Sequence, residues 1–294
     1  MGRRVHESFA AASHEVIALT RPGRMRETAA TPRGTIAVEH DLEDETGLAK
    51  IFADYRPDAV VHLAWFTAHG AYWSAPENLD CVRQSLGLLR AAATAGCRRF
   101  VGAGTCAEYD WAYERLIEGT TPCVPQTLYG AAKLAGYLIG ERYAAVAGLS
   151  FAWARYGFLF GPGEPTSRLT TAAATALLSG HDFPCSPGDQ LRDFIYVEDA
   201  ADATVALAQS DVTGAVNVGS GTPVPVRQLI EEIAALAAGP GRPLFGALPA
   251  RPGDPHLLAL DTTRLTVEVG WRPRWSLREG LGRVVDACSP RGVR

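Results

Sequence analysis

The sequence predicts an α/β fold, a doubly wound parallel sheet with a smaller α/β region after it. In the first half, short β-rich apolar runs alternate with helical stretches. Several of these runs, "DAVVHLA" and "SFAWARY" among them, are apolar on both faces, which is typical of parallel strands covered by helices on two sides. After Tyr156 the chain becomes rich in Pro and Gly, as in "FGPGEPTSR" and "PCSPGDQ", which indicates a smaller and less regular region.

Each element of the first half has its own signal. The first helix has Val5, Phe9 and Ala12 on one face, and the helix after the second strand has its acidic residues early. Expected helices are 3–12, 42–55, 77–95, 128–147, 197–209 and 226–238. Expected strands are 16–19, 35–38, 58–64, 98–104 and 150–156, with a return to the sheet near 215–220. We therefore expect two domains. The first comprises residues 1–156, and the chain returns to it near 190–218. The second comprises residues 157–189 and 219–294.

Composition excludes several classes of protein. The formal charge of −4 over 294 residues provides no broad basic field for nucleic acid. No apolar run approaches about 18 residues, so no membrane partner is expected. The six cysteines form no CxxC pair and the seven histidines no metal-binding cluster. Scattered single cysteines indicate reduced thiols, and we expect a cytoplasmic protein without a metal.

The strongest chemical signal is Tyr129 and Lys133 in "TLYGAAKLAG". A spacing of four places both side chains on one helix face, one turn apart. A neighbouring ammonium favours the phenolate, so we expect it to lower the pKa of Tyr129 toward neutrality. Thr105 ends an apolar strand upstream, and its hydroxyl is expected at the carboxyl edge of the sheet, where open α/β sheets bind ligands.

Further motifs occur in a fixed order along the chain: "GTCAEYDW", "YGAAKLAG", "FGPGEPTSRL", "RDFIYVEDAADA", "NVGSGTPVPV" and "RPGDP". With this set the chain resembles the extended short-chain dehydrogenase/reductases, of the nucleotide-sugar epimerase, dehydratase and 4-ketoreductase type. The resemblance implies a Rossmann domain that binds a nicotinamide dinucleotide and a smaller domain that binds a nucleotide sugar. It also implies a homodimer formed through the helices over 77–95 and 128–147.

The resemblance also implies roles for particular residues. In the catalytic group, Thr105 would bind the reacting sugar oxygen, Tyr129 would transfer its proton, and Lys133 would bind the nicotinamide ribose. The implied cofactor-binding residues are Gly2, Arg21, Asp41, Leu42, Leu63, Ala64, Tyr129 and Lys133. The implied substrate-binding residues are Glu108, Arg168, Arg192 and Arg251. Arginine suits a diphosphate because its planar guanidinium donates two hydrogen bonds to a phosphate.

Members of this family begin with a strand and a GxxGxxG turn that cradles the pyrophosphate. On that pattern Gly2 is the third glycine, so the first strand and two glycines are missing from the sequence. A start assigned too late, a truncation, or a decayed homologue would each explain this. We expect the chain over 1–294 to bind a dinucleotide poorly.

The expected cofactor is NADP, with NAD possible. The second strand ends in Thr20-Arg21, with Arg24 close behind, where NAD-preferring members carry an acid. Cys106-Ala107 stands where dehydratases carry an Asp-Glu pair, so elimination of water is not expected. The leading prediction is an NADP-dependent 4-ketoreductase of a nucleotide-linked 4-keto-6-deoxysugar. The alternatives are a nucleotide-sugar C4 epimerase and, in another class, a non-catalytic binding protein.

Two further residues are expected to pack in the interior, and a third stays open between two roles. His62 is interpreted as a hydrogen-bonded core histidine, and Cys106 as a small buried filler. For Tyr109 both core packing and contact with the sugar stay open.

Overall fold

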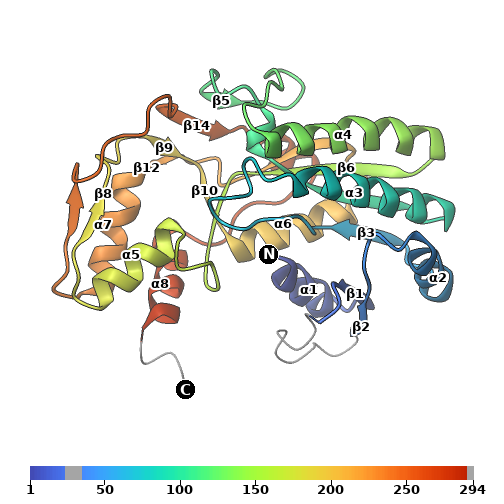
Figure 1. Ribbon diagram of the computed structural model, residues 1–294, viewed down its shortest axis with the longest axis horizontal. Coiled ribbons are helices and arrows are strands. Elements are labelled where there is room, and N and C mark those ends of the chain that lie inside the picture. The colour runs from blue at the N-terminus through green and yellow to red at the C-terminus, as the bar shows by residue number, and fades with distance from the viewer. Residues whose placement is uncertain (24–34, 290–294) are drawn as a thin grey trace.

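A computed structural model describes residues 1–23 and 35–289 (Figure 1). Its central sheet has four parallel strands in the order β11 (Gly214–Val218), β6 (Ser150–Tyr156), β4 (Arg99–Thr105) and β3 (Ala59–His62). Every residue of β4 is buried, as is every residue of β6 except the first. The predicted doubly wound parallel sheet is confirmed.

Helices cover both faces of this sheet because its strand residues alternate between two apolar cores. Phe100, Phe151 and Trp153 pack toward α3 (Glu77–Thr94) and α4 (Leu128–Ala147). Their neighbours on the other face, Val101, Ala152 and Ala154 among them, pack with residues of α6 (Val197–Gln209).

A second, two-stranded parallel sheet pairs β1 (Val16–Thr20) with β2 (Thr35–Glu39). Helix α1 (Gly2–Ala11) packs against α6 beside it, near the centre of Figure 1. Within the described ranges β1 pairs only with β2, and β3 pairs only with β4. The parallel strands are therefore interrupted between β1 and β3.

Helix α2 (Glu45–Tyr55) begins later than the expected residue 42. The Asp44 carboxylate accepts a hydrogen bond from the Gly47 backbone N–H at 3.0 Å. This is the geometry of an N-cap, which ends the preceding turn and starts the helix. The early acidic residues thus cap the helix.

The part of the chain after β6 forms another core, in which α5 (Leu169–Leu178), α7 (Val226–Ala237) and α8 (Leu277–Cys288) pack together. The remaining strands are short and pair in three groups: β12-β9-β14-β5, β13-β8 and β10-β7. Their bounds are β5 (Arg115–Leu116), β7 (Phe158–Phe160), β8 (Phe183–Cys185), β9 (Leu191–Arg192), β10 (Phe194–Tyr196), β12 (Val224–Pro225), β13 (Pro243–Phe245) and β14 (Leu257–Leu260). One-turn helices occupy Cys106–Glu108 and Arg264–Glu268.

Candidate active site

The candidate site lies where β4 ends and α4 begins. The chain leaves β4 at Thr105 and forms the one-turn helix, whose Ala107 backbone N–H donates to Thr105 Oγ1 at 3.2 Å. Helix α4 approaches this turn closely, because a Cβ built on Gly130 would lie 2.3 Å from the Ala107 carbonyl oxygen. The glycine of "YGAAK" thus lets Tyr129 reach Thr105.

Tyr129 is partly buried, and burial raises its pKa. A hydrogen bond with the Thr105 side chain opposes that effect. The expectation that Lys133 lowers the pKa of Tyr129 is wrong for this structure, since the Lys133 Nζ lies 6.0 Å from the phenol ring centroid and desolvation dominates. Tyr129 therefore stays a protonated phenol at neutral pH.

Lys133 is buried one turn further along α4. Its Nζ donates to the Ala103 carbonyl oxygen of β4 at 2.6 Å and lies 3.6 Å from the centroid of the Trp65 ring. Burial lowers the pKa of Lys133 to about 7. The structure thus brings Thr105, Tyr129 and Lys133 together at one sheet edge.

An aromatic loop, residues 65–73, surrounds the phenol. Tyr129 makes edge-on contacts with the rings of Trp65, Tyr72 and Trp73, with centroids 6.4, 4.9 and 5.7 Å away. Its backbone N–H also donates to the Trp73 carbonyl oxygen at 3.1 Å. This loop was not among the residues predicted from the sequence, although the density of aromatic residues in "AWFTAHGAYW" is a signal.

Glu108 does not reach the substrate side of the site, contrary to expectation. The residue is fully buried, and one carboxylate oxygen accepts from the Thr105 backbone N–H at 2.8 Å and from Trp153 Nε1 at 2.9 Å. The other forms an ion pair with Arg155 Nε at 2.7 Å. Because protein donors occupy both of its carboxylate oxygens, Glu108 stabilises the buried end of β4.

Two of the three arginines predicted to bind substrate, Arg168 and Arg251, place positive charge near the aromatic loop. Burial raises the pKa of Tyr72 to about 12, and the positive charges of Arg168 and Arg251 act against that rise. Both cations therefore lie within electrostatic reach of the ring that packs on Tyr129. Arg168 precedes the first turn of α5, and Arg251 follows β13.

Arg192 is buried at the end of β9. Its guanidinium forms an ion pair with Asp254 at 2.7 Å, a partner that was not predicted from the sequence. The "RPGDP" motif that contains both Arg251 and Asp254 was the available signal.

The predicted cofactor-binding residues follow the carboxyl ends of three parallel strands and the start of one helix. Arg21 is exposed after β1, and Asp41 accepts a hydrogen bond from the Glu43 N–H in the turn after β2. The remaining ones are Leu42 in that turn, Leu63 and Ala64 after β3, and Gly2 at the start of α1. Leu63 and Met1 pack against the same cluster of Val5, Ala201 and Val205, which places the start of α1 near the end of β3. Arg24 lies outside the described residues.

His62 and Cys106, which were expected in the interior, and Tyr109, for which two roles stayed open, are buried. His62 Nε2 lies 2.8 Å from Ser85 Oγ, which confirms a hydrogen-bonded core histidine. Burial raises the pKa of Cys106 to about 12, as expected of an inert filler. The Tyr109 hydroxyl donates to Asn217 Oδ1 at 2.8 Å, so this tyrosine packs in the core.

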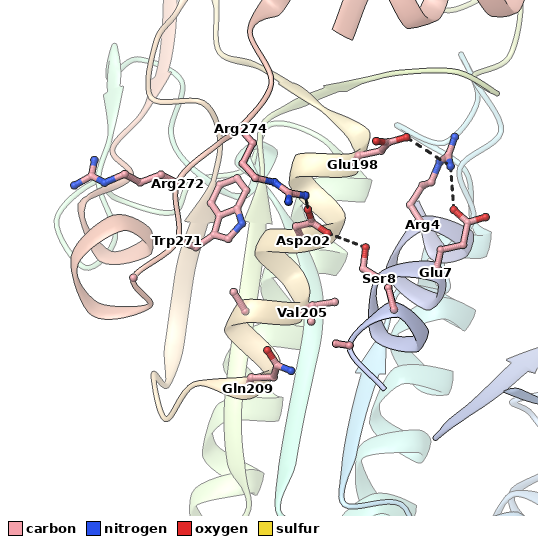
Figure 2. A pocket seen from close by; sticks show the side chains of 14 residues that line it. Arg4, Glu7, Ser8, Glu198, Asp202, Val205, Gln209, Trp271, Arg272 and Arg274 are labelled. Atoms are coloured by element: carbon pink, nitrogen blue, oxygen red, sulfur yellow. Dashed lines mark hydrogen bonds and ion pairs between the residues drawn. The ribbon is translucent and has the colours of Figure 1, made fainter. Parts of the chain in front are cut away.

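Figure 2 shows a groove of about 820 Å³ between α1, α6 and residues 270–274. Its charged side chains pair with one another: Arg4 with Glu7 at 2.9 Å, and Asp202 with both Ser8 and Arg274. None of Thr105, Tyr129 and Lys133 lines it. The Ser8–Asp202 hydrogen bond and the Arg4–Glu198 ion pair at 3.6 Å fasten α1 to α6.

Over residues 1–23 and 35–289, no group of three or more His, Cys, Asp or Glu side chains is arranged to hold a metal ion. Nor does any helix of the described chain combine the length and apolar character needed to cross a membrane.

The model of the NAD dependent epimerase/dehydratase family matches residues 1–219, so the chain belongs to this family of NAD(P)-dependent enzymes. A UDP-glucose 4-epimerase of Rhizobium leguminosarum bv. trifolii is 29% identical over 267 residues, which cover 83% of this chain and 81% of the relative. A dTDP-glucose 4,6-dehydratase of Streptomyces niveus is 29% identical over 201 residues, 68% of this chain and 60% of the relative.

Among solved structures, the UDP-glucose 4-epimerase of Thermus thermophilus in complex with NAD matches with a TM-score of 0.81 and 27% identity, covering 99% of this chain and 96% of that one. The Thermotoga maritima UDP-glucose 4-epimerase with UDP-glucose matches with a TM-score of 0.82 and 25% identity, covering 96% and 93%. These matches confirm the Rossmann-like fold.

Proposed function

We propose that this protein catalyses the NADP-dependent reduction of the C4 ketone of a nucleotide-linked 4-keto-6-deoxysugar. The observation that carries the proposal is the convergence of Thr105, Tyr129 and Lys133 at one sheet edge, with Arg168 and Arg251 within electrostatic reach of the same loop. Open α/β sheets bind their ligands at this edge.

In this mechanism Arg168, Arg192 and Arg251 bind the diphosphate and nucleotide of the substrate. Asp254 holds the Arg192 guanidinium in one orientation through their ion pair. The sugar carbonyl oxygen then lies between the hydroxyls of Thr105 and Tyr129. Thr105 donates a hydrogen bond to that oxygen, and Tyr129 donates its proton as negative charge develops there.

The protonated state of Tyr129 supports the direction of the reaction. Burial raises the pKa of the phenol, so it enters the reaction as an acid. A ketone that gains a hydride at carbon needs an acid at oxygen, whereas oxidation of an alcohol would first need a base. We do not propose elimination of water, although one relative is named a dTDP-glucose 4,6-dehydratase, because the carboxylate of Glu108 is occupied and Cys106 and Ala107 carry no acid.

The eight cofactor-binding residues named above would hold a nicotinamide dinucleotide, which would supply the hydride, and we expect the chain over 1–294 to bind it poorly. Lys133 and Tyr129 would meet the nicotinamide end, while Leu63 and Ala64 would lie beneath the ribose and pyrophosphate. Gly2 lies at the α1 N-terminus, whose backbone N–H groups favour a phosphate. Asp41 and Leu42 would meet the adenine. Arg21, exposed at the end of β1, would pair with a 2′-phosphate, which favours NADP over NAD.

C4 epimerisation of a nucleotide sugar is the second candidate. It is favoured by the relatives named UDP-glucose 4-epimerase, both by sequence and by structure. The same three side chains would serve it, with Tyr129 first accepting and then returning a proton.

We further propose that residues 1–156, with the return near 190–218, hold the cofactor and that 157–189 and 219–294 hold the nucleotide sugar. We also propose that the protein is cytoplasmic and forms a homodimer through α3 and α4. The dimer is supported by apolar side chains that stay exposed on these two helices: Leu79, Leu138, Ile139 and Val146.

The test is stoichiometric. A 4-keto-6-deoxysugar nucleotide is mixed with the protein and NADPH, and absorbance at the NADPH band is followed together with product. Loss of one NADPH for each product formed supports the reductase. Because a C4 ketone has no configuration to invert, the epimerase is tested separately with a nucleotide-linked 4-hydroxyhexose and NAD, and inversion at C4 without net change in the cofactor supports it. The same assay on a chain extended by in-frame upstream coding sequence, if a strand and GxxGxxG lie there, tests the non-catalytic alternative, which predicts no turnover from either chain.

A further inference from the structure

Lys133 is held by a tryptophan and a carbonyl oxygen. The sequence contains two lysines, Lys50 and Lys133, and within the described residues only Lys50 forms an ion pair. The Lys133 ammonium lies over the face of Trp65 and donates to Ala103 O. At 3.6 Å from the ring centroid, this is a close cation–π contact, and tryptophan gives the strongest such contact.

Trp65 is itself held in place by a hydrogen bond from its indole nitrogen. Its Nε1–H donates to Asn78 Oδ1 at 2.8 Å. Asn78 is fully buried at the start of α3, and its amide nitrogen donates to the Tyr72 and Ala75 carbonyl oxygens at 2.8 Å each. The buried amide thus locks both the ring and the loop that packs on Tyr129.

We propose that Trp65 is a positioning residue for Lys133, whose ring face holds the ammonium at the end of β4 and favours its charged form. This proposal depends on the proposed function in one respect: Lys133 is one of the residues that act in the proposed reaction. Among the hydrogen bonds of the described chain, the Ala103 backbone carbonyl oxygen accepts from this ammonium, and no side chain does. Replacing the ring therefore removes one of two attachments.

Four titratable groups face Lys133 from the elements around it. Glu108 of the one-turn helix and Cys81 of α3 favour its charged form. His62 of β3 stays neutral, since burial lowers its pKa to about 3, and Tyr129 of α4 stays a phenol. Because Glu108 is already paired with Arg155, the Ala103 carbonyl oxygen at 2.6 Å and the Trp65 ring face at 3.6 Å are the two nearest sources of negative potential.

The small number of lysines makes a direct test possible. The full chain, labelled with ¹³C,¹⁵N-lysine and without cofactor or sugar, gives NMR signals from Lys50 and Lys133 alone. The Trp65→Leu variant keeps an apolar side chain but removes the ring, and we expect the pKa of Lys133 to fall by about one unit, a tenfold change in its protonation equilibrium. Trp65→Phe, which keeps a ring face, should restore at least half of that shift.

Trp271→Phe is the matched control, because Trp271 lines the groove between α1 and α6 and does not contact Lys133. It should leave Lys133 unchanged, and Lys50 should titrate identically in all variants. A Lys133 pKa that is unchanged in Trp65→Leu, or that rises because water enters, would overturn the proposal.

The wild-type protein provides a second readout that does not depend on the folding of a variant. The ring current of Trp65 should shift the ε-methylene protons of Lys133 upfield of those of Lys50. Equal shifts would contradict the contact. Neither readout depends on turnover, so a failed sugar-reduction assay would leave this result standing.

Discussion

The two groups of parallel strands in this protein differ in how completely they are enclosed. In β4 every residue is buried, whereas in β1 none is, and all five are only partly covered. The four-stranded sheet has a helical layer on each face, while the β1–β2 pair relies on α1 and α2 nearby. Parallel strands depend on such cover and on neighbours at both edges.

The residues of the candidate site are divided between these two groups of strands. Thr105 lies on the enclosed sheet, and Tyr129 and Lys133 lie on α4, which packs against it. Arg21 and Asp41, which are proposed for the adenosine end of the cofactor, lie on the partly covered pair. The residues proposed for the chemistry therefore lie in the more enclosed region, and those proposed for the adenosine end of the cofactor lie in the less enclosed one.

The largest expected effect concerns the enclosed region. Tyr129→Phe removes the proton donor and keeps the ring contacts, so we expect kcat/KM to fall by about 10²- to 10⁴-fold. The melting temperature should stay within a few degrees of the wild type. Tyr113→Phe, at an exposed tyrosine, is the control and should be fully active. Full activity of Tyr129→Phe would remove the phenol from the mechanism.

A stability effect should follow from the buried ion pair beneath Thr105. Arg155→Met leaves the Glu108 carboxylate buried without its cation, and we expect a loss of about 3–5 kcal/mol in the free energy of unfolding. Arg98→Met, which breaks a pair with Asp58 that is about 80% exposed on both sides, should cost less than about 1 kcal/mol. Equal losses in urea unfolding would refute the contrast.

Much of this contrast could be predicted from the sequence. Strands such as "SFAWARY" are apolar throughout, so their place in a covered parallel sheet follows from composition. The YxxxK spacing likewise predicted that Tyr129 and Lys133 share a face, and the structure places both beside Thr105. These properties are local, and periodicity reports them directly.

Other features depend on contacts between distant segments, which no local pattern encodes. Glu108 was expected at the substrate, but Arg155 lies 47 residues away and pairs with it. The Trp65 contact with Lys133 is of the same kind. Helix α5 was not predicted because its sequence, "LTTAAATALL", has no polar face. Helix α8 was not predicted either, although the Ser276–Glu279 capping box is a readable signal for its start.

The difference in enclosure can be measured by amide hydrogen exchange. We expect the amides of Val16–Thr20 to exchange at least about tenfold faster than those of β4, because local opening is easier where strands are partly covered and have an unpaired edge. Mass spectrometry of peptides from the two strands would show it. Equal protection would mean that the β1–β2 pair is as firmly held as the central sheet.

The smallest effect concerns cofactor choice. Arg21→Glu should weaken NADPH binding about tenfold and leave NADH binding unchanged or improved, because a carboxylate repels a 2′-phosphate and accepts from a 2′-hydroxyl. Titration of both cofactors, with Arg242→Glu at an exposed arginine just before β13 as control, would decide. Parallel losses for NADPH and NADH would argue against a 2′-phosphate contact.

The central claim, that Tyr129 and its neighbours act at the C4 carbon of a nucleotide-linked sugar, is tested most directly by the fate of a labelled hydride. A 4-keto-6-deoxysugar nucleotide is reduced with NADPH that carries deuterium at the transferable position, at a cofactor concentration shown by titration to saturate. We predict one deuterium at C4 of the product by NMR, and transfer of the label that is about 10²- to 10⁴-fold slower with Tyr129→Phe. Deuterium at another carbon, or a product without deuterium, would contradict it.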